Sequence, residues 1–262
     1  DIVFLCLPDA AAKEAVLLCE NPETKIIDAS TAHRTADGWA YGFPELSPDF
    51  RKSIATGRFI ANPGCHAGGF ISLVYPLVSE GLVPSDYPFV AHSVTGYSGG
   101  GKKMIAQYEA VDRAKELDSP RQYGLTLKHK HLPEMQVIGG IAKAPAFVPV
   151  VCDYYSGMQV LVPLDLKLAG TSAEAVAAGI ADYYKEGATV SVHALNEPLP
   201  ENGLYSNALS GSDRMELYMT VNAAGDQMML VSLFDNLGKG SSGAAIQCMN
   251  LMLGMDETEG LE

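Results

Sequence analysis

Asp1-Ile2-Val3-Phe4-Leu5-Cys6-Leu7-Pro8 opens the chain as an unbroken apolar run, which is typical of a strand buried on both faces of a parallel sheet. Asp9 is placed to cap a helix over 10–19, and Lys25-Ile26-Ile27-Asp28 has the pattern of the next strand. This strand–helix–strand order predicts an α/β fold with a Rossmann-type, doubly wound parallel sheet. Because such a sheet rarely begins with its most buried strand, we expect its N-terminal part to be missing.

Beyond residue 64 the pattern changes to α+β. The acidic tail, 256–262, is expected to fray. Strands are expected at 87–95, 158–166, 215–223 and 227–234, the last two as a hairpin across Ala224-Gly225-Asp226, and helices at 102–117, 172–185 and 242–253.

Composition restricts the class of partner. The 262 residues include 18 Lys and Arg against 31 Asp and Glu, for a net charge of −13. This balance argues against nucleic-acid and anionic-membrane partners, but it allows an anionic small substrate at a locally positive site. No apolar stretch approaches the roughly 20 residues of a membrane span. Five widely spaced cysteines are typical of reduced thiols in a cytoplasmic protein.

Asn62-Pro63-Gly64-Cys65-His66-Ala67-Gly68-Gly69 places one cysteine where a turn meets an apolar helix. The unpaired N–H groups and the positive dipole end at a helix N-terminus favour a thiolate over a thiol. Cys65 is therefore predicted to be a nucleophile. The alternative is a buried structural cysteine.

Two histidines stand in His129-Lys130-His131-Leu132-Pro133-Glu134, where the proline and glutamate mark the first turn of a helix. A cysteine nucleophile needs a nearby base that later acts as an acid, so His131 is the first candidate and His129 the second. Solvated imidazoles on a surface turn and a His-x-His metal site are the alternatives. No second ligand cluster with zinc spacing occurs, and no metal is predicted. His66 is a weaker candidate, because helix neighbours point apart.

Four further segments could contact a ligand. The glycines of 235–243 allow close backbone approach, although this segment could equally be a structural turn. Residues 95–103 combine backbone amides, a hydroxyl and two lysines in a candidate anion cradle, or else form a flexible surface loop. Arg34 in 30–34 could pair with a phosphate, a carboxylate or a surface acid. Glu45 in 41–46 is as easily structural as functional.

These segments, in this order, resemble the N-acetyl-γ-glutamyl-phosphate reductases of arginine biosynthesis, especially their shorter type. The resemblance spans nearly the whole chain, and the combination of the Cys65 and His129–Glu134 motifs is specific. It is carried by Leu5–Pro8, Asp28–Arg34, Tyr41–Leu46, Asn62–Cys65, Ser98–Lys102, His129–Glu134 and Asp235–Gly243.

The resemblance implies an NADP-binding Rossmann-type domain (1–64 and 236–262) and an α+β catalytic and dimerisation domain (65–235). It implies attack of Cys65 on N-acetylglutamyl phosphate, a thioester, reduction by NADPH, and a homodimer or homotetramer. Members begin with a strand and a Gly-x-x-Gly-x-x-Gly turn that this chain lacks ahead of Ile2. Expected cofactor contacts are Pro8, Ser30, Thr31, Gly68, Asn236, Gly238 and Lys239. Expected substrate contacts are Arg34, Glu45, Asn62, Ser98, Gly99 and Lys102.

Three rival interpretations remain. An aspartate-semialdehyde dehydrogenase or another acyl-phosphate reductase would use the same chemistry on a different substrate. A cysteine hydrolase or acyltransferase would use Cys65 and a histidine without nicotinamide. A non-catalytic remnant would have an unreactive Cys65.

Overall fold

The computed structural model describes all 262 residues, and its N-terminal part contains the predicted βαβ unit. Strand β1 (Ile2–Leu5) pairs in parallel with β2 (Lys25–Asp28), and α1 (Asp9–Leu18) connects them. The sheet continues through β4 (Phe59–Ala61) to β3 (Ala40–Tyr41), and every pairing in it is parallel. We call this four-stranded sheet the N-terminal sheet. The predicted Rossmann-type arrangement is confirmed.

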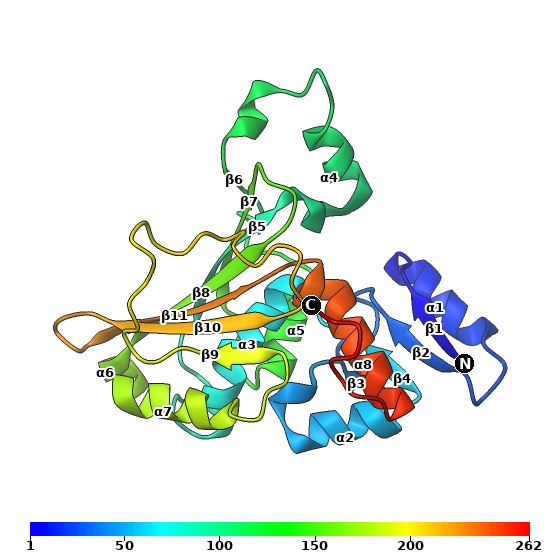
Figure 1. Cartoon of the computed structure of the whole chain (residues 1–262), viewed down its shortest axis with the longest axis horizontal. Coiled ribbons are helices and arrows are strands. Elements are labelled where there is room, and N and C mark those ends of the chain that lie inside the picture. The colour runs from blue at the N-terminus through cyan, green and yellow to red at the C-terminus, as the bar shows by residue number, and fades with distance from the viewer.

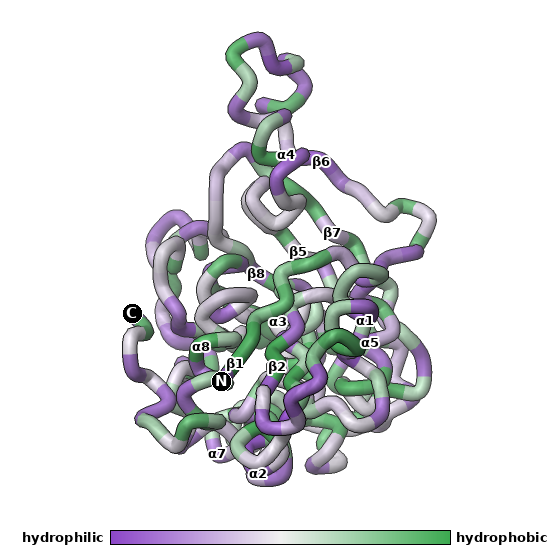
Figure 2. Tube along the Cα trace, turned by 90° about the vertical axis from the view of Figure 1, so that its right-hand side faces the viewer, coloured by the Kyte–Doolittle hydropathy of each residue, from purple (hydrophilic) through white to green (hydrophobic).

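One expectation about β1 is wrong. It is an edge strand of the N-terminal sheet, and Val3 and Phe4, which point to opposite faces, are each 41% exposed. In this structure the apolar run therefore belongs to a strand whose two faces are both partly exposed. Figure 2 shows its hydrophobic trace beside that of β2.

A second, seven-stranded sheet carries most of the remaining chain, in the order β6-β7-β5-β8-β11-β10-β9. The predicted hairpin is confirmed, because β10 pairs antiparallel with β11 through seven register positions. Helices α3, α5 and α7 lie along this mixed sheet in Figure 1 and contribute to its core. Its strands are β5 (Val90–Gly96), β6 (Arg121–Gln122), β7 (Ala146–Cys152), β8 (Met158–Asp165), β9 (Val190–Val192), β10 (Met215–Val221) and β11 (Gln227–Phe234).

Helix α3 (Cys65–Ser79) forms the centre of that core, since its apolar residues extend around the helix. Gly69 lets it approach the sheet closely. A Cβ atom there would lie 2.6 Å from Val160 Cγ2 on β8 and 2.7 Å from Phe234 Cε1 on β11. The N-terminus of α3 is thereby held at a defined place against the seven-stranded sheet.

The remaining helices complete the two layers. Helix α8 returns to the N-terminal sheet and shares a small core with α2 and strands β2 and β4. No helix of the structure has both the length and the hydropathy needed to span a membrane. These helices are α2 (Pro48–Thr56), α4 (Gly101–Tyr108), α5 (Leu132–Ile138), α6 (Leu166–Ala169), α7 (Ala173–Tyr183) and α8 (Gly243–Leu253), with short helical turns η1 (Pro44–Leu46), η2 (Tyr97–Gly100), η3 (Lys115–Asp118) and the π-helical η4 (Gly238–Ser242).

The helix expected at 102–117 is shorter than predicted. α4 ends at Tyr108, and the chain turns before η3, so this segment projects from the body in Figure 1. Arg113 stabilises the turn through ion pairs with Asp118 (2.6 Å) and Asp153 (2.5 Å). The ion pairs of Arg113 stabilise a bend in a segment that the spacing of apolar residues predicted to be one helix.

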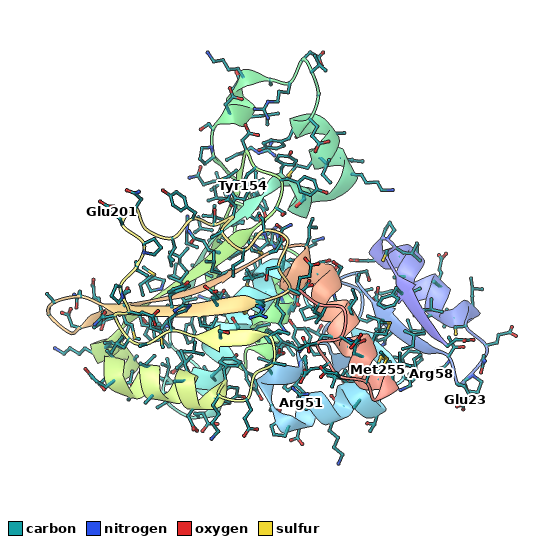
Figure 3. The ribbon with its side chains drawn as sticks, viewed as in Figure 1. Glu23, Arg51, Arg58, Tyr154, Glu201 and Met255 are labelled. Atoms are coloured by element: carbon teal, nitrogen blue, oxygen red, sulfur yellow. The ribbon has the colours of Figure 1, made fainter.

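The acidic tail does not fray. Asn250 Nδ2 on α8 donates to the carbonyl oxygens of Glu257 and Glu259, at 3.3 and 2.9 Å. Arg51, labelled on α2 in Figure 3, pairs with the Glu257 carboxylate at 2.8 Å. The backbone N–H of Asp213 donates to the Glu262 carbonyl at 2.7 Å. Partners far away in the sequence therefore order this segment.

Candidate active site

A cavity of about 350 Å³ lies where the N-terminus of α3 meets loops from both sheets. The carboxyl ends of β2 and β4 lead into it, which is where parallel α/β sheets place their ligands. Its lining includes Cys65, His129, His131, Arg34, Ser98, Gly99 and Asn236. The structure thus brings both candidate acid/base histidines to the predicted nucleophile.

Cys65 is the first residue of α3 and is partly buried. Burial raises the pKa of its thiol, while the charge of Arg34 and a hydrogen bond from the His66 backbone N–H act in the opposite direction. The expectation that the helix N-terminus favours the thiolate is therefore not met in the free protein, because desolvation outweighs it. A base must remove the proton for Cys65 to attack.

His131 is the candidate for this base. Its side chain is buried, and Nδ1 has no hydrogen-bond partner. Burial, followed by the neighbouring His66 and Arg34 charges, holds its pKa well below the ordinary histidine value. The ring is therefore neutral at neutral pH and can accept a proton.

His129 supports the position of His131. Its Nδ1 accepts a hydrogen bond from the His131 backbone N–H at 3.2 Å. Burial and Lys130 lower the pKa of His129 to about 4. No group of three or more His, Cys, Asp or Glu side chains in the structure is arranged to hold a metal ion.

Glu134 is a residue whose place in the site the sequence interpretation missed. Its Oε1 accepts hydrogen bonds from Tyr41 Oη and from the Gly64 backbone N–H, both at 2.8 Å. Its Oε2 pairs with Arg34 Nη1 at 3.1 Å, and both partners are buried. Glu134 was recognised only as a mark of a helix start, since nothing local shows that its carboxylate reaches the nucleophile turn.

Arg34 lines the cavity and also holds the surrounding backbone. Its Nε donates to the Asn62 carbonyl at 2.9 Å, and Nη2 donates to the Ala29 carbonyl at 3.1 Å. These contacts and the Glu134 pair orient the guanidinium group, whose five N–H donors exceed the three partners it has here. Glu134 compensates the charge, but the remaining guanidinium N–H groups can donate to an anionic substrate group in the cavity.

The two glycine-containing loops meet through one side-chain contact. Asn236 Nδ2 donates to Ser98 Oγ at 2.9 Å, and Asn236 Oδ1 accepts from the Gly157 backbone N–H at 2.8 Å. Both side chains line the cavity, as does Gly99. Lys102 is exposed on α4 and does not line the cavity. Of the anion cradle expected at 95–103, the serine and the glycines therefore reach the cavity and the lysines do not.

Glu45 and Lys239 are placed differently from the prediction. Lys239 Nζ lies 2.9 Å from both Glu45 carboxylate oxygens and 2.6 Å from Gln247 Oε1, in a buried network outside the cavity. Thr189 also hydrogen-bonds to Glu45 at 2.6 Å. Each charge already has its counter-charge, so neither side chain is presented to a ligand.

Gly238 also has a structural position. A Cβ atom at this residue would lie 2.1 Å from the Ser212 carbonyl oxygen, and Gly238 does not line the cavity. Its position therefore serves the packing of η4 against the 212 loop. The glycine-rich segment 235–243 therefore serves in part as a structural turn, which is one of the two interpretations that its sequence allowed.

The other expected cofactor contacts lie near the carboxyl edge of the N-terminal sheet. Ser30 Oγ donates to Asp28 at 2.7 Å, and the Thr31 backbone N–H donates to Asp9 at 3.0 Å. Pro8 immediately precedes α1. None of these three residues lines the cavity.

One feature beside the nucleophile fits a nicotinamide cofactor. Asn62 Oδ1 is buried without a hydrogen-bond partner, while Asn62 Nδ2 donates to the Ser241 carbonyl at 2.9 Å. At Gly68, in the first turn of α3, an added Cβ atom would meet Pro63 Cβ at an ordinary contact distance of 3.7 Å. The unpaired Asn62 acceptor suits the N–H donor of a carboxamide such as that of nicotinamide.

His66 and Tyr123 are further cavity-lining residues with a direct hydrogen bond between them, at 2.7 Å. The sequence makes His66 a weaker candidate and gives no local signal for Tyr123. His66 does not compete with His131 for the acid/base position, because both of its ring nitrogens already have partners.

The chain is similar to known proteins both in its two domains and along nearly its whole length. Residues 65–236 match the semialdehyde dehydrogenase dimerisation domain, and residues 1–54 match the semialdehyde dehydrogenase NAD binding domain. The chain is 44% identical over 256 residues to the N-acetyl-gamma-glutamyl-phosphate reductase of Burkholderia orbicola, covering 97% of this chain and 82% of that protein. It is 43% identical to that of Trichormus variabilis, covering 100% and 84%.

Solved structures agree on the fold. Aspartate semialdehyde dehydrogenase II from Vibrio cholerae superposes with a TM-score of 0.74 at 15% identity, covering 97% of this chain and 79% of that one. The chain belongs to the semialdehyde dehydrogenase family, and within it to the N-acetyl-gamma-glutamyl-phosphate reductases.

Proposed function

We propose that this protein reduces N-acetylglutamyl 5-phosphate to N-acetylglutamate 5-semialdehyde and phosphate, with NADPH as the reductant, as a step of arginine biosynthesis. The observation that carries the proposal is the placement of Cys65, His131 and Arg34 around one cavity. The curated relatives named N-acetyl-gamma-glutamyl-phosphate reductase support the choice of substrate.

The first half of the reaction is acyl transfer to sulfur. His131 accepts the Cys65 proton, and the sulfur attacks the acyl carbon of the acyl phosphate. A C–S bond forms, the bond from the acyl carbon to the phosphate oxygen breaks, and phosphate leaves with that bonding pair. Arg34, with its spare N–H donors, holds the phosphate by charge-assisted hydrogen bonds.

The second half converts the thioester to an aldehyde. The hydride for the thioester carbon would come from a nicotinamide dinucleotide when it is bound. As the thiohemiacetal collapses, the carbonyl re-forms and the C–S bond breaks, and the protonated His131 returns its proton to the departing Cys65 sulfur. The same histidine therefore takes a proton in one half of the reaction and returns it in the other.

The two sheets have different roles in this proposal. We assign residues 1–64 and 236–262 to cofactor binding, with Ser30, Thr31, Pro8, Gly68 and Asn236 near the dinucleotide, and residues 65–235 to catalysis and subunit contact. Ser98 and Gly99 are proposed to contact the substrate, whereas Asn62, expected from the sequence to do so, is assigned to the cofactor because of its unpaired acceptor. The match to a dimerisation domain supports a homo-oligomer, a homodimer or homotetramer. The five cysteines without disulfide bonds favour the cytoplasm.

The deciding experiment is phosphate-dependent reduction of NADP⁺, run in parallel with N-acetylglutamate semialdehyde and with aspartate semialdehyde. Activity with the acetylated substrate alone supports the proposal. Activity with aspartate semialdehyde alone assigns the protein to the other substrate, and activity with neither contradicts the dehydrogenase proposal.

A further inference from the structure

Ser93, His66 and Tyr123 form a hydrogen-bonded chain that ends at the cavity. His66 Nδ1 lies 2.7 Å from Ser93 Oγ on β5, and His66 Nε2 lies 2.7 Å from Tyr123 Oη, just beyond β6. Ser93 is fully buried, whereas Tyr123 lines the same cavity as Cys65. The reaction described above makes no use of these three side chains.

The middle member of the chain is a neutral imidazole. Burial, followed by the charges of His129 and Lys130, lowers the pKa of His66 to about 3. A neutral imidazole has one N–H donor and one acceptor nitrogen. The chain of hydrogen bonds must therefore run in one direction or the other.

The hydroxyl group of Ser93 fixes the direction in which these hydrogen bonds are donated. Its hydroxyl proton has one acceptor within hydrogen-bond reach in the structure, His66 Nδ1. If His66 carried its proton on Nδ1, the buried Ser93 proton would have no acceptor, which folded proteins avoid. Ser93 therefore donates to Nδ1, and His66 carries its proton on Nε2 and donates it to Tyr123 Oη.

This direction leaves the Tyr123 proton for the cavity. The Tyr123 backbone N–H donates to the Pro149 carbonyl at 3.1 Å, which fixes the residue against β7. Burial and then the negative charge of a Cys65 thiolate raise the pKa of Tyr123, so the hydroxyl stays protonated. Because Tyr123 and Cys65 line the same cavity, a neutral donor is available at the site of acyl transfer.

We propose that the Tyr123 hydroxyl donates a hydrogen bond to the carbonyl oxygen of the acyl group on Cys65, where negative charge develops in the tetrahedral transition states. Ser93 and His66 are positioning residues that keep the Tyr123 proton directed into the cavity. Preorganised donors of this kind stabilise developing oxyanions. The inference rests on the proposed function only in that Cys65 must accept an acyl group.

The protonation of His66 can be measured without any activity. Multiple-bond ¹H–¹⁵N correlation spectra of ¹⁵N-labelled protein distinguish the two imidazole tautomers, and the His66 signals are identified by their loss in His66→Gln. The expected result is a neutral His66 with a protonated Nε2 and a bare Nδ1 at pH 6 to 8. A proton on Nδ1 overturns the proposal.

The role of Tyr123 can be measured in acyl transfer alone. With 4-nitrophenyl acetate, Cys65 exchanges its S–H proton for the acetyl group and 4-nitrophenol is released, so no nicotinamide is needed. The background rate is taken from Cys65→Ser. Tyr123→Phe is expected to acylate about 100-fold more slowly, whereas Tyr205→Phe, at an exposed tyrosine outside the cavity, is expected to match the wild type. A wild-type rate in Tyr123→Phe overturns the proposal.

A double-mutant cycle tests the positioning role. Ser93→Ala is expected to slow acylation by a smaller factor in the wild-type background and to have no effect in the Tyr123→Phe background, because Ser93 acts through the Tyr123 proton. An equal loss in both backgrounds indicates a structural role for Ser93 and contradicts the inference.

In the reductase assay, Tyr123→Phe is expected to lower kcat, while KM should stay within a few-fold of the wild-type value. If Cys65 is acylated but neither semialdehyde is oxidised, the proposed function fails and the acylation result still decides on Tyr123.

Discussion

The backbone N–H of Gly64 donates to Oε1 of Glu134 across 2.8 Å, which ties the turn before the nucleophile to the helix that follows the two histidines. Glu134 also pairs with Arg34, so the nucleophile turn, the cationic group and the acid/base segment share one buried carboxylate. Three sequence segments are thereby joined through a single side chain.

Gly64 should tolerate no side chain. A Cβ atom there would lie 2.3 Å from Arg34 Nη1 and 2.6 Å from His131 Nε2, so Gly64→Ala must displace one or both groups. We expect kcat/KM to fall by a factor of 100 or more, since misplacing reacting groups by about 1 Å has that effect. Circular dichroism and thermal unfolding of the variant check that the fold is retained. Near-wild-type turnover in a folded Gly64→Ala would contradict the site geometry.

Cys65→Ser should abolish reduction, because the serine hydroxyl is a far weaker nucleophile and leaving group than a thiol. The binding of NADP⁺, followed by the change in intrinsic fluorescence, should be largely unchanged. Cys19→Ser, at a partly buried cysteine after α1 and outside the cavity, provides the matched control and should retain activity. Substantial turnover by Cys65→Ser would remove Cys65 from the mechanism.

Alkylation of Cys65 by iodoacetamide should be slow at neutral pH and should continue to accelerate above the ordinary thiol pKa. The reason is that burial raises the pKa of this thiol in the free protein, so only a small fraction is thiolate near pH 7. The measurement is the rate of Cys65 modification against pH, followed by mass spectrometry of the peptide that contains it. A rate that reaches its plateau below pH 7 would show a thiolate stabilised in the resting protein.

Glu134→Gln should destabilise the fold as well as the activity. The amide keeps an acceptor for Gly64 and Tyr41 but leaves the buried Arg34 charge without its partner. Breaking a buried pair in this way costs about 3–5 kcal/mol. Urea unfolding measures the loss of stability, and Glu14→Gln on the exposed face of α1 is the control with no expected change. An unfolding free energy equal to that of the wild type would contradict the assigned pair.

Lys239→Met distinguishes the structural role of Lys239 from the cofactor contact expected from the sequence. Removal of the charge leaves Glu45 buried and uncompensated, so the free energy of unfolding should fall by about 3–5 kcal/mol. The double variant Lys239→Met/Glu45→Leu should recover part of this loss, since both charges are then gone. A raised KM for NADP⁺ with unchanged stability would instead support direct contact with the cofactor.

The same ion pair should affect stability in acid. Burial raises the pKa of Glu45, but the Lys239 charge and three hydrogen bonds outweigh it and leave the pKa below its ordinary value. A carboxyl group with a depressed folded-state pKa stabilises the fold above its unfolded-state pKa, and this contribution is lost as the pH falls through the folded-state pKa. We expect Glu45→Gln to remove this component from the acid arm of the unfolding free energy measured against pH. An unchanged acid arm would contradict the linkage.

The secondary structure of this protein could largely be predicted where the pattern is local. The βαβ start and the hairpin at 215–234 follow from apolar runs and turn residues that stand next to one another in the chain. The bend after Tyr108 and the ordered tail could not, since Arg113 and Asn250 are held by partners that only the folded chain brings near. The exposure of β1 likewise depends on its place at the sheet edge.

The amino-acid sequence by itself determined the chemistry: a cysteine at a turn-to-helix junction, two histidines ahead of a helix start, and glycine-rich loops near both. Local backbone preferences are sufficient to place such residues on their elements. Only the tertiary structure decided which side chains face the cavity, because that depends on long-range pairing. Buried charges require partners, so Lys239 turns toward Glu45, while Arg34 is held beside Cys65 by Glu134, one hundred residues further along the chain.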